Sequence, residues 1–293
     1  MIANSMCLAC IFSKQEKRVR FVKDEEKKAA FIHDILQLMA DYGRVQTNPW
    51  LVMKMDEIYE HYFGAPYDYS QIKHKFNQLM LDKEEELEQA IRADDDLIHG
   101  CLKYVSAGNY IDFGALEKVN ESVLAEILSN AQTQSFDASV IARFKEDCKN
   151  GKKLVYCTDN CGEIVLDKLF IKILKEQYPH LEITVLVRGK PTINDATIED
   201  AEEVGLTDLV PVIGNGYSIP STVMDVISEP AKQLLMDADV IIAKGQGNFE
   251  GLYGEKLNPY FLFLCKCELF QIRFGLEQYS PVFAKEDQIK DVK

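Results

Sequence analysis

The chain has 293 residues, of which 47% are hydrophobic and 27% are charged, so it can bury a sizeable core. Its formal net charge of −14 argues against general nucleic-acid binding, which needs clustered lysine and arginine. No segment approaches the roughly 20 consecutive apolar residues of a membrane span, and the N-terminus does not resemble a signal peptide. We therefore expect a cytoplasmic protein with neither nucleic acid nor a membrane as partner; the sequence predicts no oligomeric state.

The first half of the chain has helical periodicity. From Lys14 to Lys149 apolar residues recur at helical spacing, with stripes at Phe31, Ile32, Ile35, Leu36, Leu38 and Met39 and at Ile72, Phe76, Leu79 and Met80. Glycine, asparagine and proline interrupt the pattern at Gly43, Asn48-Pro49, Gly64 to Pro66 and Gly108-Asn109. We predict five to seven helices, one of them running from Asp112 or Gly114 to about Ser129, and interpret residues 1–150 as a helical subdomain.

The pattern changes after Gly151, where short β-rich runs alternate with helical segments. Strands are predicted at 154–158, 183–187, 209–213, 240–243 and 260–264, and helices at 163–178, 198–204 and 230–236. This alternation predicts an α/β domain over residues 151–293, with a mostly parallel sheet sandwiched by helices in a Rossmann-like three-layer arrangement. Ligands bind such sheets at the carboxyl ends of the strands, so the residues after each strand are the candidates for a site.

The first predicted strand is followed by Thr158-Asp159-Asn160-Cys161-Gly162-Glu163. Carboxylate and amide oxygens so close together suit Mg²⁺ or Mn²⁺ better than zinc. The start of the next helix also offers backbone N–H groups to an anion. The alternative is that Asp159 or Asn160 only caps that helix, because both residue types are favoured there.

The second predicted strand ends in a segment that combines cations with another Asn-Asp pair, Asn194-Asp195. Asp195 could complete a metal site with Asp159 and Asn160, while Arg188 or Lys190 could contact a phosphate. Capping of the helix predicted at 198–204 is the competing explanation for Asn194 and Asp195.

The fourth predicted strand runs into Lys244-Gly245-Gln246-Gly247-Asn248-Phe249-Glu250. Gly245 and Gly247 allow the backbone to approach a ligand and to present N–H donors to an anion, and Lys244 adds a positive charge. The segment fits a dinucleotide fingerprint poorly, because Glu250 stands where the third glycine is required and the first strand lacks the motif.

The cysteines and histidines indicate no catalytic centre. Eight cysteines in a protein of this length are not a disulfide scaffold, and Cys101, Cys148 and Cys157 lie in apolar patterns typical of buried thiols. Cys7 and Cys10 have the spacing of half a zinc or redox site, which Cys265 and Cys267 could complete; buried structural thiols are the simpler alternative. The five histidines show no metal-ligand spacing, which argues against a zinc hydrolase or a catalytic triad.

Four segments together resemble a known family, the damage-control phosphatases, which include the C-terminal domain of pantothenate kinase 4 and acidic-residue methyltransferase-like proteins. The matching segments are residues 158–163, 190–197 with Asn194-Asp195-Ala196-Thr197, 244–250, and 106–114 with a GNxxD pattern at Asn109 and Asp112. The CxxC at Cys7 is similar to that of the compact, mainly prokaryotic branch of the family.

The resemblance implies one divalent metal ion, Mg²⁺, Mn²⁺, Ni²⁺ or Co²⁺, held by Asp159, Asn160 and Asp195. It also implies that Asn109 and Asp112 approach the same cleft and that Lys244 faces the phosphate. We assign catalytic roles to Asp159, Asp195 and Lys244, and substrate binding to Asn109, Asp112, Lys190, Gly245, Gly247 and Asn248.

The implied activity is metal-dependent hydrolysis of small phosphate monoesters such as sugar phosphates or damaged phosphometabolites. We expect in-line attack on the phosphate, with Asp159 or Asp195 as a possible general base or nucleophile. Two alternatives stay open: a nonenzymatic sensor of a phosphometabolite or metal, and an S-adenosylmethionine-dependent carboxyl methyltransferase. The methyltransferase fits less well, because only Gly162 supplies a glycine after the first strand.

Overall fold

A computed structural model describes residues 1–65, 67–114 and 119–289. Within these ranges eight α-helices precede the first strand: α1 Ser5–Val19, α2 Glu25–Tyr42, α3 Asn48–Phe63, α4 Ser70–Leu81, α5 Glu84–Arg92, α6 Leu97–Gly108, α7 Glu121–Ser129 and α8 Ala138–Asn150. Strands and helices alternate after them: β1 Lys153–Cys157, α9 Glu163–Gln177, β2 Glu182–Val187, α10 Ile198–Glu203, β3 Val212–Gly214, α11 Glu229–Met236, β4 Val240–Lys244, α12 Gly245–Leu252, β5 Tyr260–Leu264, α13 Glu268–Phe274 and β6 Pro281–Lys285.

The strands of the described residues form one sheet in the order β3-β2-β1-β4-β5-β6. β1 to β5 pair in parallel, and β6 runs antiparallel to β5 at the edge. The strand order reverses direction at β1, which has β2 on one side and β4 on the other. In open α/β sheets this switch point is where a ligand-binding crevice forms, at the carboxyl ends of the strands.

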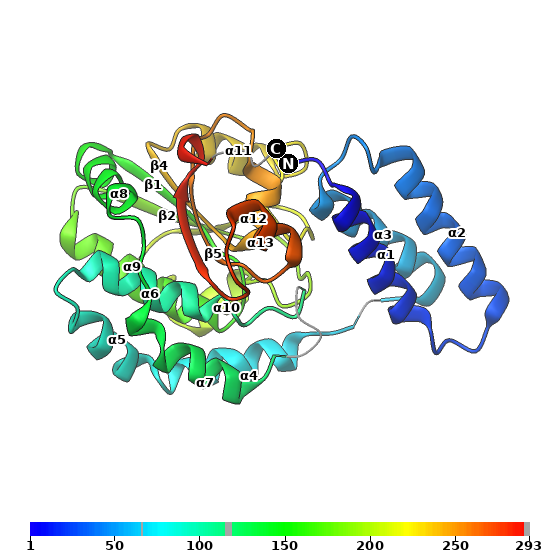
Figure 1. The fold of residues 1–293 in the computed structure, drawn as a ribbon, viewed down its shortest axis with the longest axis horizontal. Coiled ribbons are helices and arrows are strands. Elements are labelled where there is room, and N and C mark those ends of the chain that lie inside the picture. The colour runs from blue at the N-terminus through cyan, green and yellow to red at the C-terminus, as the bar shows by residue number, and fades with distance from the viewer. Residues whose placement is uncertain (66, 115–118, 290–293) are drawn as a thin grey trace.

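Both faces of the sheet are buried under helices (Figure 1). Successive residues of β1 alternate between two cores: Leu154 and Tyr156 belong to one, Val155 and Cys157 to the other. Helices α4 to α9 contribute side chains to the first core, and α11, α12 and α13 to the second. The three-layer α/β arrangement predicted from the sequence is therefore confirmed.

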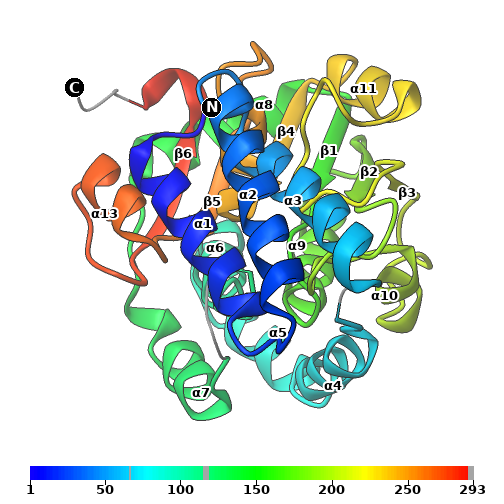
Figure 2. The ribbon, with the colours of Figure 1, turned by 90° about the vertical axis from the view of Figure 1, so that its right-hand side faces the viewer.

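Helices α1, α2 and α3 form a small bundle, which we call the cap, at one end of the molecule (Figures 1 and 2). The cap has its own apolar core, built from Cys7, Ile11, Val19, Phe31, Ile35, Leu51 and Met55. Helix α3 of the cap packs against α12, whereas α4 to α8 share the first core with the sheet. The division of the chain into domains at residue 150 stays a prediction.

Several elements differ from the sequence prediction. The helix predicted to begin at Asp112 or Gly114 is α7, which begins at Glu121 after its cap Asn120; part of the predicted start, residues 115–118, lies outside the described residues. The third strand is shorter than predicted, because Val210 N–H donates to Leu206 O and continues the turn after α10. β6, α12 and α13 were not predicted. None of the helices in the described ranges could cross a bilayer on grounds of length and hydropathy.

Candidate active site

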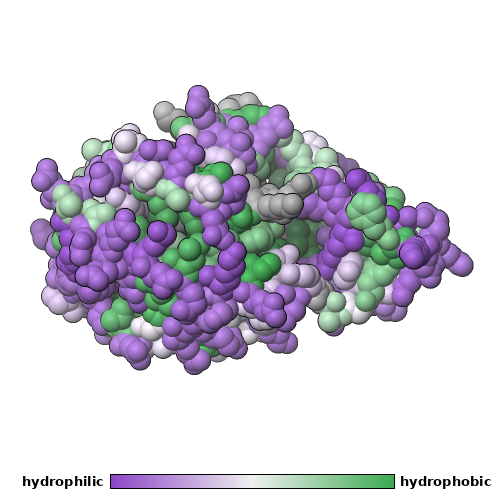
Figure 3. Space-filling view, turned by 90° about the horizontal axis from the view of Figure 1, so that it is seen from below, coloured by the Kyte–Doolittle hydropathy of each residue, from purple (hydrophilic) through white to green (hydrophobic). Residues whose placement is uncertain are grey.

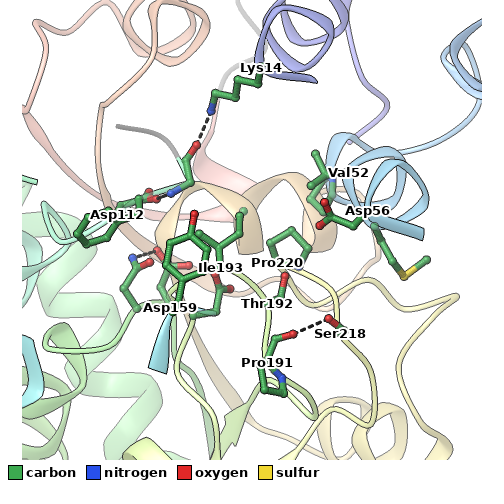
Figure 4. A pocket seen from close by; sticks show the side chains of 18 of the residues that line it. Lys14, Val52, Asp56, Asp112, Asp159, Pro191, Thr192, Ile193, Ser218 and Pro220 are labelled. Carbon is green, nitrogen blue, oxygen red and sulfur yellow. Dashed lines mark hydrogen bonds between the residues drawn. The ribbon is translucent and has the colours of Figure 1, made fainter. Parts of the chain in front are cut away.

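A cavity of about 1250 Å³ lies between the cap and the carboxyl edge of the sheet. Figure 3 shows the surface hollowed between these two parts of the molecule, and Figure 4 shows side chains of both parts around the space. The predicted site residues that line it are Asp112, Asp159, Asn160, Lys190, Asp195 and Gly247. The volume exceeds that of many small-molecule sites, which span roughly 300–1,000 Å³, so a metabolite fits together with water.

Backbone hydrogen bonds join the segment after β1 to the segment after β2. Ala196 N–H donates to Asp159 O at 2.8 Å, and Cys161 N–H donates to Asn194 O at 2.8 Å. Asn160 and Asp195 consequently face each other in a short antiparallel bridge. The three predicted metal ligands, Asp159, Asn160 and Asp195, therefore meet at the switch point although two segments supply them.

Asp159 is held by amide donors and is only 6% exposed. Its Oδ2 accepts from Asn109 Nδ2 at 3.0 Å and from Asn160 Nδ2 at 2.7 Å. Burial raises the pKa of Asp159 well above its ordinary range, and the neighbouring carboxylates of Glu163 and Asp195 raise it further. A negative charge at this position is thus stabilised mainly when a cation lies beside it.

The turn from β4 into α12 passes directly over this carboxylate. Gly245 adopts φ +79°, and a Cβ atom added to it would lie 2.0 Å from Asp159 Oδ2. Both the left-handed backbone and the close approach require glycine at this position. Gly245 therefore shapes the floor of the site, although it does not line the cavity.

Arg188 contacts both Asp195 and Asp159 and does not itself line the cavity. Its Nε donates to Asp195 Oδ2 at 2.6 Å, its Nη1 to Asn248 Oδ1 at 3.1 Å, and its Nη2 lies 3.4 Å from Asp159 Oδ1. Burial raises the pKa of Asp195 to about 6, and the Arg188 guanidinium opposes that shift. Because Arg188 is fully buried, it orients carboxylates here and does not reach the cavity as a phosphate contact.

The donors at this edge fit a divalent cation. Asp159, Asn160 and Asp195 supply hard oxygen atoms, and Asp159 has no cation closer than the 3.4 Å guanidinium contact among the described residues. No group of three or more histidine, cysteine, aspartate and glutamate side chains suited to a metal occurs in the described ranges. The candidate set has two carboxylates and one carboxamide, and no four-cysteine site forms from Cys7, Cys10, Cys265 and Cys267.

The structure corrects the predicted position of Lys244. The side chain is completely buried and does not line the cavity; its ammonium donates to Glu163 Oε1 and, at 2.8 Å, to Asp167 Oδ1. Tyr156 O–H also donates to Asp167 Oδ1, at 2.6 Å. Two buried carboxylates draw the lysine inward, because an unpaired charge in the core is far more unfavourable than a paired one.

Asn109 and Asn248 also lie behind the cavity wall. Asn109 Nδ2 donates to Asp159 and Glu163, and its Oδ1 accepts from Leu264 N–H at 3.1 Å. Asn248 Nδ2 donates to Thr158 O at 2.9 Å and to Lys244 O at 2.6 Å. Both carboxamides tie strand ends together and neither lines the cavity, so their role in substrate binding stays a prediction.

The sequence analysis missed Lys266. This residue follows β5 by two positions, its side chain is fully buried, and its Nζ donates to Asp112 Oδ2 at 2.7 Å. The positive charge of Lys266 also opposes the raised pKa of Asp159. The position of Lys266 just after the fifth predicted strand is the local signal, because ligands bind parallel sheets at the carboxyl ends of the strands.

Residues 3–282 match the damage-control phosphatase ARMT1-like domain. The chain belongs to this family. A damage-control phosphatase of Archaeoglobus fulgidus is 28% identical to the chain over 273 residues, covering 92% of this chain and 93% of that one. An uncharacterized protein of Methanocaldococcus jannaschii is 28% identical over 288 residues, covering 95% and 94%.

A solved structure supports the fold of this damage-control phosphatase family member. The crystal structure of a DUF89 family protein from Pyrococcus horikoshii has a TM-score of 0.81 to this chain, at 24% sequence identity. The likeness covers 98% of this chain and 99% of the other. The cap, the sheet and the helices around it therefore belong to one fold shared along the whole length.

Proposed function

We propose that this chain is a metal-dependent phosphatase that hydrolyses phosphate monoesters of small metabolites, with sugar phosphates and damaged phosphometabolites as its substrates. The observation that carries the proposal is the meeting of Asp159, Asn160 and Asp195 at the switch point of the sheet, beside a cavity of metabolite size. The family match supports it, as does the name of the Archaeoglobus relative. Eight free cysteines support the cytoplasm as its compartment.

Asp159, Asn160 and Asp195 would hold one divalent ion, Mg²⁺, Mn²⁺, Ni²⁺ or Co²⁺. When bound, such an ion supplies neutralisation of phosphoryl charge and polarisation of the attacking water. The chain's own contribution is orientation: Asn109 fixes Asp159, and Arg188 fixes Asp195. Positioning of this kind supplies most of the catalysis in phosphoryl transfer.

The cavity also offers one cation for the phosphate, Lys190, and a carboxylate for proton transfer, Asp195. Lys190 lies exposed on the cavity wall, where its charge can attract the substrate dianion. Asp195, whose pKa burial raises to about 6, can accept the proton of an attacking water near neutral pH. Asp159 is the other candidate for this role. If an aspartate instead attacks phosphorus and water then attacks the resulting acyl phosphate at phosphorus, two displacements give retention of configuration at a chiral phosphate, whereas direct attack by water gives inversion.

Phosphate release from metal-stripped protein tests the proposal. The substrates are p-nitrophenyl phosphate and a panel of sugar phosphates, each with Mg²⁺, Mn²⁺, Ni²⁺ or Co²⁺, and the variants are Asp159→Asn and Asp195→Asn. Asp137→Asn, which keeps a capping side chain on α8 far from the cavity, is the matched control. We expect metal-dependent release that both site variants abolish and the control retains. Metal or ligand binding by calorimetry without any release would instead favour a nonenzymatic sensor.

A further inference from the structure

The cap side of the cavity contains a polar residue where helix α1 is otherwise apolar. Cys7, Ile11 and Val19 form the buried stripe of α1 and belong to the core of the cap. Gln15 occupies the remaining position of this stripe, lines the cavity and is only 6% exposed. Its Oε1 is buried and has no hydrogen-bond donor among the described residues.

A second carboxamide of the cap has the same property. Asn48, at the start of α3, also lines the cavity, and its Nδ2 donates to Glu250 Oε2 at 3.0 Å. When Glu250 is ionised its carboxylate oxygens can only accept, so the contact holds the nitrogen of Asn48 toward Glu250. Asn48 Oδ1 is left buried, without a donor in the described part of the chain.

A buried acceptor that receives no hydrogen bond from the chain needs a donor from water or from a ligand, because an unpaired buried polar atom is unfavourable. Native proteins keep few such atoms, and those that persist usually serve a ligand or an ordered water. Both residues line the same cavity, Asn48 next to the carboxyl group of Glu250 and Gln15 further along α1. Acidic side chains also outnumber basic ones around this cavity. The wall is therefore rich in acceptors and poor in donors.

We propose that Gln15 and Asn48, at separate places on the cap wall of the cavity, each accept a hydrogen bond from the organic part of the substrate, from hydroxyl groups or a protonated amine; we call these two acceptors the cap subsite. The inference rests on the proposed function, since it assumes that the phosphate lies at Asp159 and Asp195. Figure 4 shows the cap residues Val52 and Asp56 across the cavity from Thr192 and Asp159. A substrate that fills this space reaches from the sheet edge to the cap, and its donor group decides selectivity there.

Three six-carbon phosphate esters test the subsite: n-hexyl phosphate, which has no donor on its chain, sorbitol 6-phosphate and 6-aminohexyl phosphate. The ratio of kcat/KM between a donor-bearing ester and hexyl phosphate is measured for the wild type, Gln15→Leu and Gln15→Glu. Gln37→Leu is the control, because the Gln37 side chain is exposed on α2 and donates to Asp41 one turn away. Thermal unfolding of each metal-loaded variant is measured alongside.

We expect the wild type to prefer one or both donor-bearing esters and Gln15→Leu to lose about fivefold of that preference, the effect of one hydrogen bond. Gln15→Glu, which keeps the acceptor, is expected to retain the preference, and to strengthen it if the donor is an amine. Gln15→Leu is also expected to raise the Tm, since it removes an unpaired acceptor from an apolar stripe, whereas a merely structural glutamine would make the variant less stable.

Separate outcomes would overturn the cap subsite and the phosphatase activity. Hydrolysis of hexyl phosphate with no preference for either donor-bearing ester, or an unchanged preference in Gln15→Leu, would overturn the subsite and leave the phosphatase standing. Absence of hydrolysis of every ester with every metal would overturn the phosphatase and the subsite together.

Discussion

The Nζ atom of Lys244 lies 2.8 Å from Oδ1 of Asp167, and both side chains are completely buried beneath the carboxyl edge of the sheet. Glu163 contacts the same ammonium, so two carboxylates share one lysine. Burial raises the pKa of Asp167 to about 6, and Lys244 opposes the shift. Lys244 thereby holds Glu163 in place. Glu163 accepts a hydrogen bond from the Asn109 amide, and the same amide donates to Asp159.

Replacement of Lys244 by methionine should therefore lower the stability of the fold, because Lys244 contacts buried carboxylates and does not line the cavity. We expect a loss of about 3–5 kcal/mol in the free energy of unfolding, because two buried carboxylates lose their counter-ion. Urea unfolding measures it. Lys232, which is partly exposed and pairs with the exposed Glu229, is the control, and Lys232→Met is expected to leave the free energy of unfolding almost unchanged.

A further variant separates charge from packing at this position. Lys244→Met combined with Glu163→Gln and Asp167→Asn removes all three charges and is expected to recover part of the lost stability. Equal stability of Lys244→Met and the wild type would show that the lysine is not needed to balance these carboxylates.

Gly245→Ala should disable the site, because the added Cβ would lie 2.0 Å from Asp159 Oδ2 and must displace the carboxylate. We expect metal-dependent activity to fall about 100-fold, the effect of an ångström-scale misplacement in an active site. Gly254→Ala is a matched control, since Gly254 also has a positive φ, +95°, but nothing lies within 4 Å of its added Cβ. Similar activity in the two variants would contradict the role of Gly245.

Arg188→Lys should lower activity about tenfold or more, although it keeps the charge. A lysine cannot reproduce the fork that contacts Asp195, Asn248 and Asp159 at once. Metal affinity is expected to weaken in the same variant, because the aspartates lose their fixed orientation; calorimetric titration measures it. Arg143→Lys, at a two-bond pair with Asp287 on the surface, is expected to retain full activity.

Glu250 should make stability fall with rising pH. Burial raises its pKa to about 7 in the folded chain from an ordinary value of 4.5. Between these values the folded state holds more protons than the unfolded state, so the free energy of unfolding declines as pH rises, by up to about 3 kcal/mol. Asp167 and Asp195, whose pKa values burial also raises, add to the decline, so we expect Glu250→Gln to make it smaller, as measured by urea unfolding from pH 4.5 to 8. If the free energy of unfolding changed with pH equally in the wild type and the variant, Glu250 would not contribute to the decline.

Much of the sheet edge could be predicted from the sequence, for a simple geometric reason. Parallel strands end at the same edge, so polar residues after β1 and β2, Asp159 and Asp195, had to lie near one another. The antiparallel β6 was missed, because a short strand at the end of the chain gives little periodic signal. The roles of the site residues stay predictions until the variants above are measured.

The directions of the long cationic side chains could not be predicted. Lys244 turns inward toward Asp167 on α9, and Arg188 turns inward toward Asp195. These directions depend on tertiary packing, which the sequence pattern does not reveal. The contact between Asn48 and Glu250 joins residues 202 positions apart, so no local sequence pattern could predict it. Gln15 did carry a local signal, as the polar member of an apolar stripe in α1.

The separate apolar core of the cap has a consequence for how such a protein diverges. Because α1, α2 and α3 are held together by their own side chains, substitutions on the α1 and α3 faces toward the cavity leave the packing of the sheet intact. Under the proposed function, a change of the cap side of the cavity would alter substrate preference while the carboxyl edge of the sheet, with Asp159 and Asp195, stays unchanged. The same separation makes α1 and α3 the natural place for a directed library that retunes selectivity.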